Sequence, residues 1–398
     1  MSLLLGWVIF VAALLISIML HEFGHFATAK KFHMKVTQFF VGFGQTLWST
    51  TRGETEYGIK VLPFGGFVKI TGMTALEDID PADEARSFRR QPGWQRAIVL
   101  AAGSFMHFAL AFVLLVVLAI GVGLANDNST RIGTVASCVP ASVSALDRGS
   151  CTHSRGEAPA RKAGIRAGDQ IVAIAGKPVH GWTQLGSAIR AQPAGKPVAI
   201  TVLRDGRRLV LHAVPALVPG RTGSYLGIEN AVQYQQLNPL RAVSYAGSTF
   251  GEVLTGSAAA VGHLPAAIPD LFAKDRAKTP AGQVSSVVGV GGLTAQIVAA
   301  KDSWRIKVGY VLLIIISLNI FVGAFNLLPL LPLDGGHLAV VIYERARAGL
   351  ARLRGRPDPG LVDMRKLVPL SVGVFAVLVG FGLLLITADI FNPIHFVQ

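Results

Sequence analysis

Long apolar runs without a charged side chain divide this sequence into segments. Four stretches contain no Asp, Glu, Lys or Arg: residues 2–20, 97–125, 308–333 and 367–388. Each reaches or approaches the length of about 20 residues with which a helix crosses a bilayer. The pattern therefore predicts four transmembrane helices. We expect the first run to be retained, because it lacks a basic segment before it and a polar motif follows where a signal cleavage site would be.

The composition agrees with a membrane protein. Hydrophobic residues make up 51% of the 398 residues, and charged residues only 15%, against about 25% in soluble domains. The length suffices for a membrane bundle and one soluble domain. The net charge of +14 lies mostly beside apolar runs, where it sets membrane orientation. We therefore expect a lipid bilayer and not nucleic acid as a partner.

The positions of the basic residues predict the orientation. They follow the first and third runs and precede the second and fourth: Lys30, Lys31, Lys35, Arg86, Arg89, Arg90, Arg96, Arg345, Arg347, Arg352, Arg354, Arg356, Arg365 and Lys366. No Lys or Arg precedes the first run or follows the fourth. The positive-inside rule then predicts cytoplasmic loops at 30–96 and 344–366, with both termini and the 126–307 segment outside.

A metal-binding motif follows the first run. His21-Glu22-Phe23-Gly24-His25 has the pattern H-E-x-x-H. On a helix, residues four apart share a face, so His21 and His25 can hold one Zn²⁺. Glu22 stands beside them, where it can take a proton from a zinc-bound water. Two helical histidines are more often packed or solvated, but such a cluster at the end of a membrane helix is costly and indicates function.

A third ligand is expected at the end of the third run, because a catalytic zinc takes three protein ligands. The first and third runs cross the membrane in the same direction, so their ends lie at similar depth. The third ends in Asn326-Leu327-Leu328-Pro329-Leu330-Leu331-Pro332-Leu333-Asp334-Gly335-Gly336-His337. The prolines end the helix, and we predict Asp334 as the ligand rather than part of a simple surface turn. His337 and, less closely, His107 are the alternatives.

These two motifs carry a family resemblance. H-E-x-x-H followed by N-x-x-P-x-x-P-x-D-G resembles the site-2 protease family, which are intramembrane zinc metalloproteases of regulated intramembrane proteolysis. Residues 41–72 resemble the family's membrane-associated β-hairpin. The resemblance covers essentially the whole chain and is strongest to bacterial members with one PDZ domain, particularly actinobacterial ones. It implies His21, His25 and Asp334 as ligands of one Zn²⁺ per chain, with Glu22 as the catalytic base.

One stretch departs from the family pattern. Members often carry G-P-x-x-N in the second span, whereas this chain has Gly103-Ser104-Phe105-Met106-His107. We expect His107 to hydrogen-bond a neighbouring helix and leave it out of the catalytic set.

The segment between the second and third runs resembles a bacterial PDZ domain. The string A-G-I-x-x-G-D-x-I-x-x-I-x-G starts at residue 163. Short strands are predicted at 131–136 and 198–204, a helix at 182–191, and an Asp-Gly hairpin turn at 204–207. Tyr225-Leu226-Gly227-Ile228 is similar to the loop that receives a chain terminus or a strand. The alternative is a domain without a ligand that acts as a steric gate.

The two cysteines, Cys138 and Cys151, both lie in this external segment. Because disulfides persist outside the membrane, we expect a bridge between them; two unpaired thiols are the alternative.

The expected fold is thus a multi-pass α-helical membrane protein with four transmembrane helices, a membrane-associated β-hairpin and an inserted extracytoplasmic α/β PDZ domain. Its expected parts are the first two transmembrane helices with the zinc motif and hairpin (1–125), the PDZ domain (126–232), surface helices (233–307) and the last two transmembrane helices with the Asp motif (308–398).

The expected function is an intramembrane zinc metalloprotease that cleaves single-span transmembrane proteins. The resemblance implies a bacterial inner-membrane enzyme with its zinc near the cytoplasmic side and a substrate such as an anti-sigma factor already trimmed outside. Gly65, Gly66, Phe67 and Asn326 are predicted to bind the unwound substrate. A non-catalytic PDZ scaffold with a structural zinc would need a fourth ligand. A metal transporter would need more intramembrane His, Asp or Glu along a path.

Overall fold

The computed structural model describes residues 2–393 except 74–76, 127, 148–149, 232, 274–275, 277–278, 280–283 and 302. The chain forms two compact units. The first contains Met1–Val122 and Asn238–Gln398, and the second contains Gly123–Leu237.

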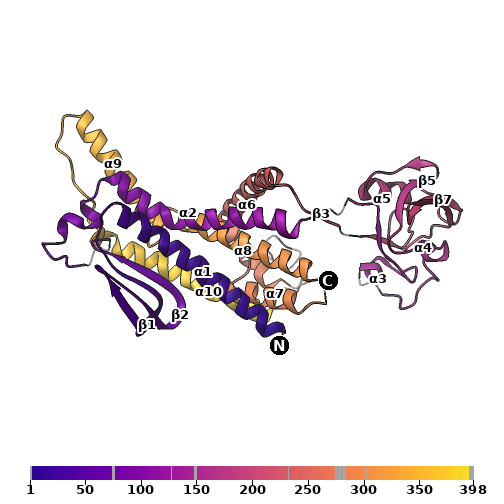
Figure 1. The fold of residues 1–398 in the computed structure, drawn as a ribbon, viewed down its shortest axis with the longest axis horizontal. Coiled ribbons are helices and arrows are strands. Elements are labelled where there is room, and N and C mark those ends of the chain that lie inside the picture. Colours follow the sequence, from indigo (N-terminus) through magenta and orange to yellow (C-terminus); the bar gives the residue numbers. More distant parts are fainter. Residues whose placement is uncertain are drawn as a thin grey trace. The chain divides into compact units, whose positions relative to one another are not determined.

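The first unit is mainly helical (Figure 1). Its longer helices are α1 (Ser2–Lys31), α2 (Gly93–Val117), which continues as the π-helix η3 (Leu118–Val122), α6 (Pro239–Ala267), α7 (Val287–Ala299), α8 (Trp304–Asn326), α9 (Asp334–Leu353) and α10 (Val368–Phe391). Short 3-10 helices are η1 (Glu84–Arg86), η2 (Phe88–Arg90), η4 (Pro269–Phe272) and η7 (Met364–Leu367). Four of these segments, α1, α2 with η3, α8, and η7 with α10, are long and apolar enough to cross a membrane. The prediction of a multi-pass membrane protein is therefore confirmed.

Small residues bring α1 close to its neighbours. A Cβ on Gly24 would lie 2.5 Å from the Ala102 carbonyl oxygen of α2, and one on Gly6 would lie 2.5 Å from the Ala295 Cα of α7. In lipid, helices associate mainly by such close backbone packing, because the surrounding chains are as apolar as the side chains. Helix α1, which carries the H-E-x-x-H motif, is thus fixed from two sides.

A β-hairpin lies beside α1. Strands β1 (Val36–Arg52) and β2 (Thr55–Ile70) are antiparallel, and residues 38–41 pair on both sides, with 56–59 and with 66–69. Residues 66–70 therefore form one edge of the folded sheet. A Cβ on Gly66 would lie 2.5 Å from Met19 Sδ, so this edge rests directly on α1 just before the motif.

Ion pairs fix the turn of the hairpin. Glu54 accepts two hydrogen bonds from Arg86, at 2.7 and 2.8 Å, and one from Lys30 at 2.7 Å. The Arg86 guanidinium in particular lowers the pKa of Glu54 to about 2. The hairpin turn is thereby tied to the end of α1 and to η1.

The connection from α8 to α9 differs in part from the sequence expectation. Helix α8 ends at Asn326, turns occupy 327–333, and α9 begins at Asp334. A Cβ on Gly336 would lie 2.5 Å from the Leu331 nitrogen, so the glycines after Asp334 let this turn fold against the start of α9. Helix α9 extends to Leu353 and so occupies part of the 344–366 connection between the last two apolar helices, because Ala, Leu and Arg are strong helix formers.

The second unit contains short strands and helices. The strands are β3 (Leu124–Asn126), β4 (Ile132–Val135), β5 (Gln170–Ile174), β6 (Lys177–Pro178), β7 (Val198–Arg204), β8 (Arg207–Ala213), β9 (Ile228–Asn230) and β10 (Gln233–Gln235), and the helices are α3 (Val143–Asp147), α4 (Pro159–Lys162) and α5 (Trp182–Arg190). One sheet has the order β6-β5-β7-β8, while β4 pairs with β9 and β3 with β10.

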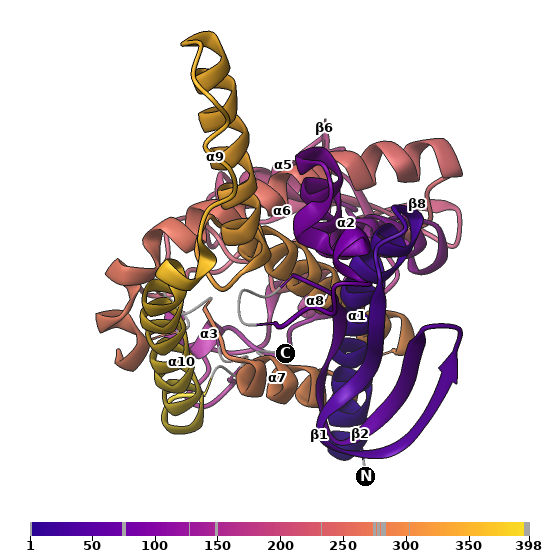
Figure 2. The ribbon, with the colours of Figure 1, turned by 90° about the vertical axis from the view of Figure 1, so that its left-hand side faces the viewer.

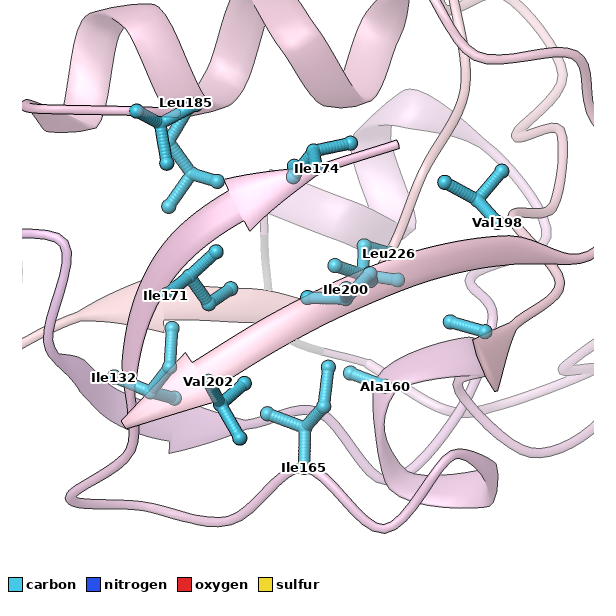
Figure 3. Close-up of a cluster of buried hydrophobic side chains, with 12 residues drawn as sticks. Ile132, Ala160, Ile165, Ile171, Ile174, Leu185, Val198, Ile200, Val202 and Leu226 are labelled. Carbon is cyan, nitrogen blue, oxygen red and sulfur yellow. The ribbon is translucent and has the colours of Figure 1, made fainter. Parts of the chain in front are cut away.

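This unit has its own hydrophobic core. Figure 3 shows Ile171 of β5 and Ile200 of β7 gathered with Leu185 of α5 and Leu226 of the loop before β9, and all four are buried. The alternating apolar positions of β7 supply one face of the sheet. The unit therefore has the means to fold around its own core.

Two motifs of this unit have clear structural roles. Arg204 donates two hydrogen bonds to the buried Asp169 of the Gly-Asp turn, at 2.7 and 2.8 Å. Asp205 and Gly206 both have positive φ, as a two-residue hairpin turn requires, and join β7 to β8. Cys138 and Cys151 are joined by a disulfide.

Candidate metal centre

Three side chains from two distant parts of the chain converge beside the C-terminal third of α1. The Nε2 atoms of His21 and His25 lie 3.1 Å apart on one face of α1. The Asp334 Oδ2 atom, at the start of α9, lies 3.1 Å from the former and 3.2 Å from the latter. Both histidines are buried. Within the part of the chain that the structure describes, this is the group of ligand atoms that could hold one metal ion.

The hydrogen bonding of this cluster fits a bound cation. The His25 Nδ1 lies 2.7 Å from the Val99 carbonyl oxygen, which can only accept. In a neutral ring this leaves a lone pair on Nε2, which faces the carboxylate of Asp334. Two acceptors in contact are stabilised when a cation lies between them. Two imidazole nitrogens and one carboxylate oxygen are a donor set that zinc accepts, and the Val99 carbonyl orients one ligand from the second coordination shell.

Helix α2 leaves room for the cluster at Gly103. A Cβ there would lie 2.5 Å from both His21 Cε1 and His25 Nε2. The glycine is thus required by close approach to the ligand atoms. From the sequence it is visible only as the retained glycine of a partly altered motif.

We expect Gly103→Ala to weaken metal binding by about 10–100-fold, the range seen when groups around a metal site are disturbed. The added methyl has no space, because His25 is also held by Val99. Zinc affinity of the purified variant, measured by competition with a chelator, checks this. Gly373→Ala on α10, where no atom lies within 4 Å of the new Cβ, is the matched control. Wild-type affinity in Gly103→Ala would show that the ligand positions do not depend on this contact.

Glu22 lies beside the cluster rather than in it. Its Oε2 accepts a hydrogen bond of 3.0 Å from the Val68 N–H, on the β2 segment that forms the sheet edge. The carboxylate is therefore held by backbone while its neighbours on α1, His21 and His25, face Asp334. This separation agrees with a base next to a metal and not with a fourth ligand.

Comparison with known proteins identifies the family. The model of peptidase family M50 matches residues 9–356. The chain belongs to peptidase family M50, the site-2 protease family. It is 35% identical to the zinc metalloprotease Rip1 of Mycobacterium tuberculosis over 413 aligned residues, covering 99% of both chains. It is 36% identical to Rip1 of Mycolicibacterium smegmatis, again over 99% of both chains. Metalloprotease MmpA of Caulobacter vibrioides is 26% identical over 88% of this chain and 94% of its own length.

The M50 chain also has a buried polar network next to the cluster. The His107 Nδ1 lies 2.8 Å from the Asn319 Oδ1 on α8, and the Asn319 Nδ2 donates to Ser17 Oγ on α1 at 3.1 Å. All three are buried, and the rings of His107 and His21 are 5.1 Å apart between centroids. The expectation that His107 hydrogen-bonds a neighbouring helix is confirmed. Asn319 and Ser17 were missed, although an amide within an apolar run is a signal of such a contact.

The other ligand candidates lie outside the cluster. His337, one turn after Asp334 on α9, and His107 contribute no atom to the group of three in the described ranges. The geometry therefore favours Asp334 as the partner of the two histidines.

The residues predicted to bind substrate lie in separate places. Gly65, Gly66 and Phe67 belong to β2, where Phe67 stacks on Phe40 with ring centroids 5.7 Å apart. Asn326 is the last residue of α8. In the second unit, Tyr225, Leu226, Gly227 and Ile228 line a cavity of about 150 Å³ together with α5.

Proposed function

We propose that this chain is an intramembrane zinc metalloprotease that cleaves single-span transmembrane proteins. Its family is a peptidase family, and its full-length relatives are zinc metalloproteases by name. We assign His21, His25 and Asp334 as ligands of one Zn²⁺ and Glu22 as the general base. The observation that carries the proposal is the convergence of three ligand atoms beside Glu22 at the ends of apolar helices.

The chemistry divides between the ion and the chain. Zinc, when bound, polarises the scissile carbonyl and makes water a stronger acid. Glu22 takes a proton from the attacking water and later donates it to the leaving amine. The Val68 N–H, which donates to the Glu22 carboxylate in this structure, orients that base.

The edge of the hairpin is the proposed substrate platform. A transmembrane helix hides its carbonyls in its own hydrogen bonds, so the substrate must be locally unwound before cleavage. An extended segment can then add as a strand to residues 66–70, which pair with β1 on one side. Because the Val68 N–H reaches Glu22, such a strand lies next to the base. Asn326 would bond the unwound backbone.

The middle of both hairpin strands, residues 43–48 and 59–64, carries features that suit contact with lipid. Its large apolar side chains are exposed: Phe43, Leu47, Trp48, Ile59, Val61, Leu62 and Phe64. An exposed apolar patch of this kind marks an interaction with a membrane or a partner. We assign it to the bilayer, because the hairpin packs against a membrane-spanning helix.

The orientation that we propose follows from the charges. Both termini and the second unit are extracytoplasmic, and the zinc lies near the cytoplasmic face of a bacterial inner membrane. The gathering of Lys and Arg at one end of the apolar helices supports this orientation. In this orientation the second unit, which we propose to be a PDZ domain, excludes substrates with large external domains. It admits trimmed ones, such as an anti-sigma-factor-like protein.

The function is tested by comparing membrane fragments. Membranes from cells that produce Glu22→Gln in place of the wild-type chain should accumulate a single-span fragment already trimmed outside. Quantitative proteomics of the two membranes measures this, and re-expression of the wild-type chain should remove the fragment. Identical fragment profiles in the two strains would contradict the proposed proteolysis.

We expect removal of the second unit to widen substrate choice without loss of cleavage. Asn126 and Gln233 form the last pair of the β3–β10 ladder, so residues 127–232 can be replaced by a two-residue Asn-Gly turn. Removing a folded domain removes a steric barrier, so substrates with large external domains should then be cut. Cleavage assays on substrates with long and short external parts measure this.

An unrelated folded domain inserted at the same turn is the control, and it should restore exclusion of the large substrates. If the deletion variant is folded and zinc-loaded but no longer cleaves the short substrate, the second unit does not act as a steric gate. It would favour recruitment through the loop of residues 225–228 instead.

A further inference from the structure

The C-terminal half of α9, residues 342–353, exposes apolar side chains that no other described helix covers. This segment is called the outer half of α9 below. Ile342, Tyr343, Leu350 and Leu353 are exposed by 59%, 58%, 47% and 87%. Figures 1 and 2 both show α9 pointing away from the other helices of the first unit. The opposite face is used differently, because Val341 and Glu344 are buried. Among the described residues of the first unit, none covers this exposed face.

Arginines border this apolar stripe on both sides. At about 100° per residue, the stripe covers roughly a quarter of the helix circumference. Arg347 and Arg354 follow it on one side, and Arg345 and Arg352 on the other. Residues 345–356 contain five arginines and no Asp or Glu. An apolar stripe between rows of basic side chains is the arrangement of helices that lie in a membrane interface.

These arginines differ from the other basic residues at the same end of the bundle. Most of those form ion pairs with carboxylates: Lys30, Lys35, Arg86, Arg89, Arg90 and Arg96. Within the described ranges, no ion pair is formed by Arg345, Arg352, Arg354 or Arg356. Their charge therefore remains available for anions outside the chain.

The position of Arg345 places the stripe near the membrane surface. Its stem packs on Gly93 at the start of α2, where a Cβ would lie 2.7 Å from Arg345 Cδ. The next residue, Trp94, is 52% exposed, and Trp at the end of a membrane helix is typical of the interface. Only ten residues, 354–363, separate the end of α9 from the apolar segment η7–α10, so the chain returns to the membrane at once.

We infer that the outer half of α9 is a binding surface for the anionic phospholipids of the leaflet nearest the metal cluster. Its apolar stripe inserts among the acyl chains just below the headgroups, while Arg345, Arg352 and Arg354 reach the phosphate groups. Arg347 instead donates hydrogen bonds to the carbonyl oxygens of Pro359 and Gly360. The first residue of the same helix is Asp334, and Glu344 is fixed to Arg96 of α2 at 2.8 Å. Lipid binding thus anchors the free end of the helix that carries the carboxylate of the metal cluster.

The test uses the full chain with Ala346→Cys, labelled with an environment-sensitive fluorophore. Ala346 lies in the exposed stripe, and the native cysteines are closed in a disulfide. The protein is reconstituted into vesicles of phosphatidylcholine alone or with phosphatidylglycerol. We expect a blue-shifted emission with phosphatidylglycerol, reversed by about 1 M salt, at which charges are screened within about 3 Å.

Variants separate charge from fold. Each basic residue near an anionic surface strengthens binding about fivefold. Arg352→Gln with Arg354→Gln should therefore lower the ratio of lipid-bound to unbound α9 about 25-fold. Arg352→Lys with Arg354→Lys should keep the response, which also reports a correctly folded helix. Arg89→Gln with Arg90→Gln removes the same charge from residues paired with Glu84 and is the matched control.

Equal emission in both vesicle types, or an equal loss in the Gln and Lys pairs, would overturn the inference. A shift that needs added cytosolic protein and not phosphatidylglycerol would overturn it as well, in favour of a protein partner. The readout needs neither zinc nor cleavage, so it fails independently of the proposed protease function.

Discussion

Purified Glu22→Gln should bind zinc as the wild-type chain does but cleave its substrate about 10²–10⁴-fold more slowly, the usual contribution of a general base. Glutamine has the same shape, and its amide oxygen can still accept the hydrogen bond from the Val68 N–H. It cannot take the proton from the attacking water. The three ligand atoms of the cluster do not include Glu22, so metal content should not change.

Single-turnover cleavage in detergent or vesicles, with zinc content measured on the same sample, checks this result. Glu56→Gln is the matched control, because Glu56 lies on β2, beside α1, and accepts a hydrogen bond from Gln38 rather than lying near the cluster. Rapid proteolysis by zinc-loaded Glu22→Gln would show that Glu22 is not the general base. Loss of zinc together with activity would indicate that Glu22 helps to hold the ion.

The sequence predicted the features that depend on local pattern. Uncharged runs gave the four apolar helices, because a membrane span needs only length and apolar composition. The spacing of His21 and His25 predicted a shared helix face, which the structure has. Asp334 could be predicted only by combining topology with motif, because it is more than 300 residues away along the chain.

The partners that tertiary packing brings together could not be predicted, even where a polar residue in an apolar run signals that a contact exists. The contact of Ser17 with Asn319 joins residues 302 positions apart, and neither residue belongs to a periodic pattern. The role of Gly103 depends on how closely α2 approaches α1. Residues 38–41 pair with β2 on both sides, at 56–59 and at 66–69. This pairing arises from bends within both strands, which the alternation of side chains does not encode. Helix α9 was missed because a run of arginines was interpreted as an orientation signal alone.

Asp334→Ala should lose both zinc and activity, unlike Glu22→Gln. The change removes the only oxygen ligand of the three, and the two histidines alone hold zinc weakly. Disturbing groups around a zinc site costs about 10–100-fold in affinity, so loss of a direct ligand should cost more than about 100-fold. The fold should persist, because the turn before α9 is held by Gly335 and Gly336 against residues 327–331 and not by the carboxylate.

Chelator competition on the purified variant measures the affinity directly. His337→Ala, one turn further along α9, is the matched control and should bind zinc as the wild-type chain does, since His337 lies outside the cluster. Asp334→Asn separates charge from shape, because it keeps the side-chain volume but provides only a neutral oxygen to the cation. Its affinity should fall between those of wild type and Asp334→Ala. Unchanged zinc affinity in Asp334→Ala with a loss in His337→Ala would assign the third ligand to His337, and the carboxylate beside the histidines would then serve only to orient their rings.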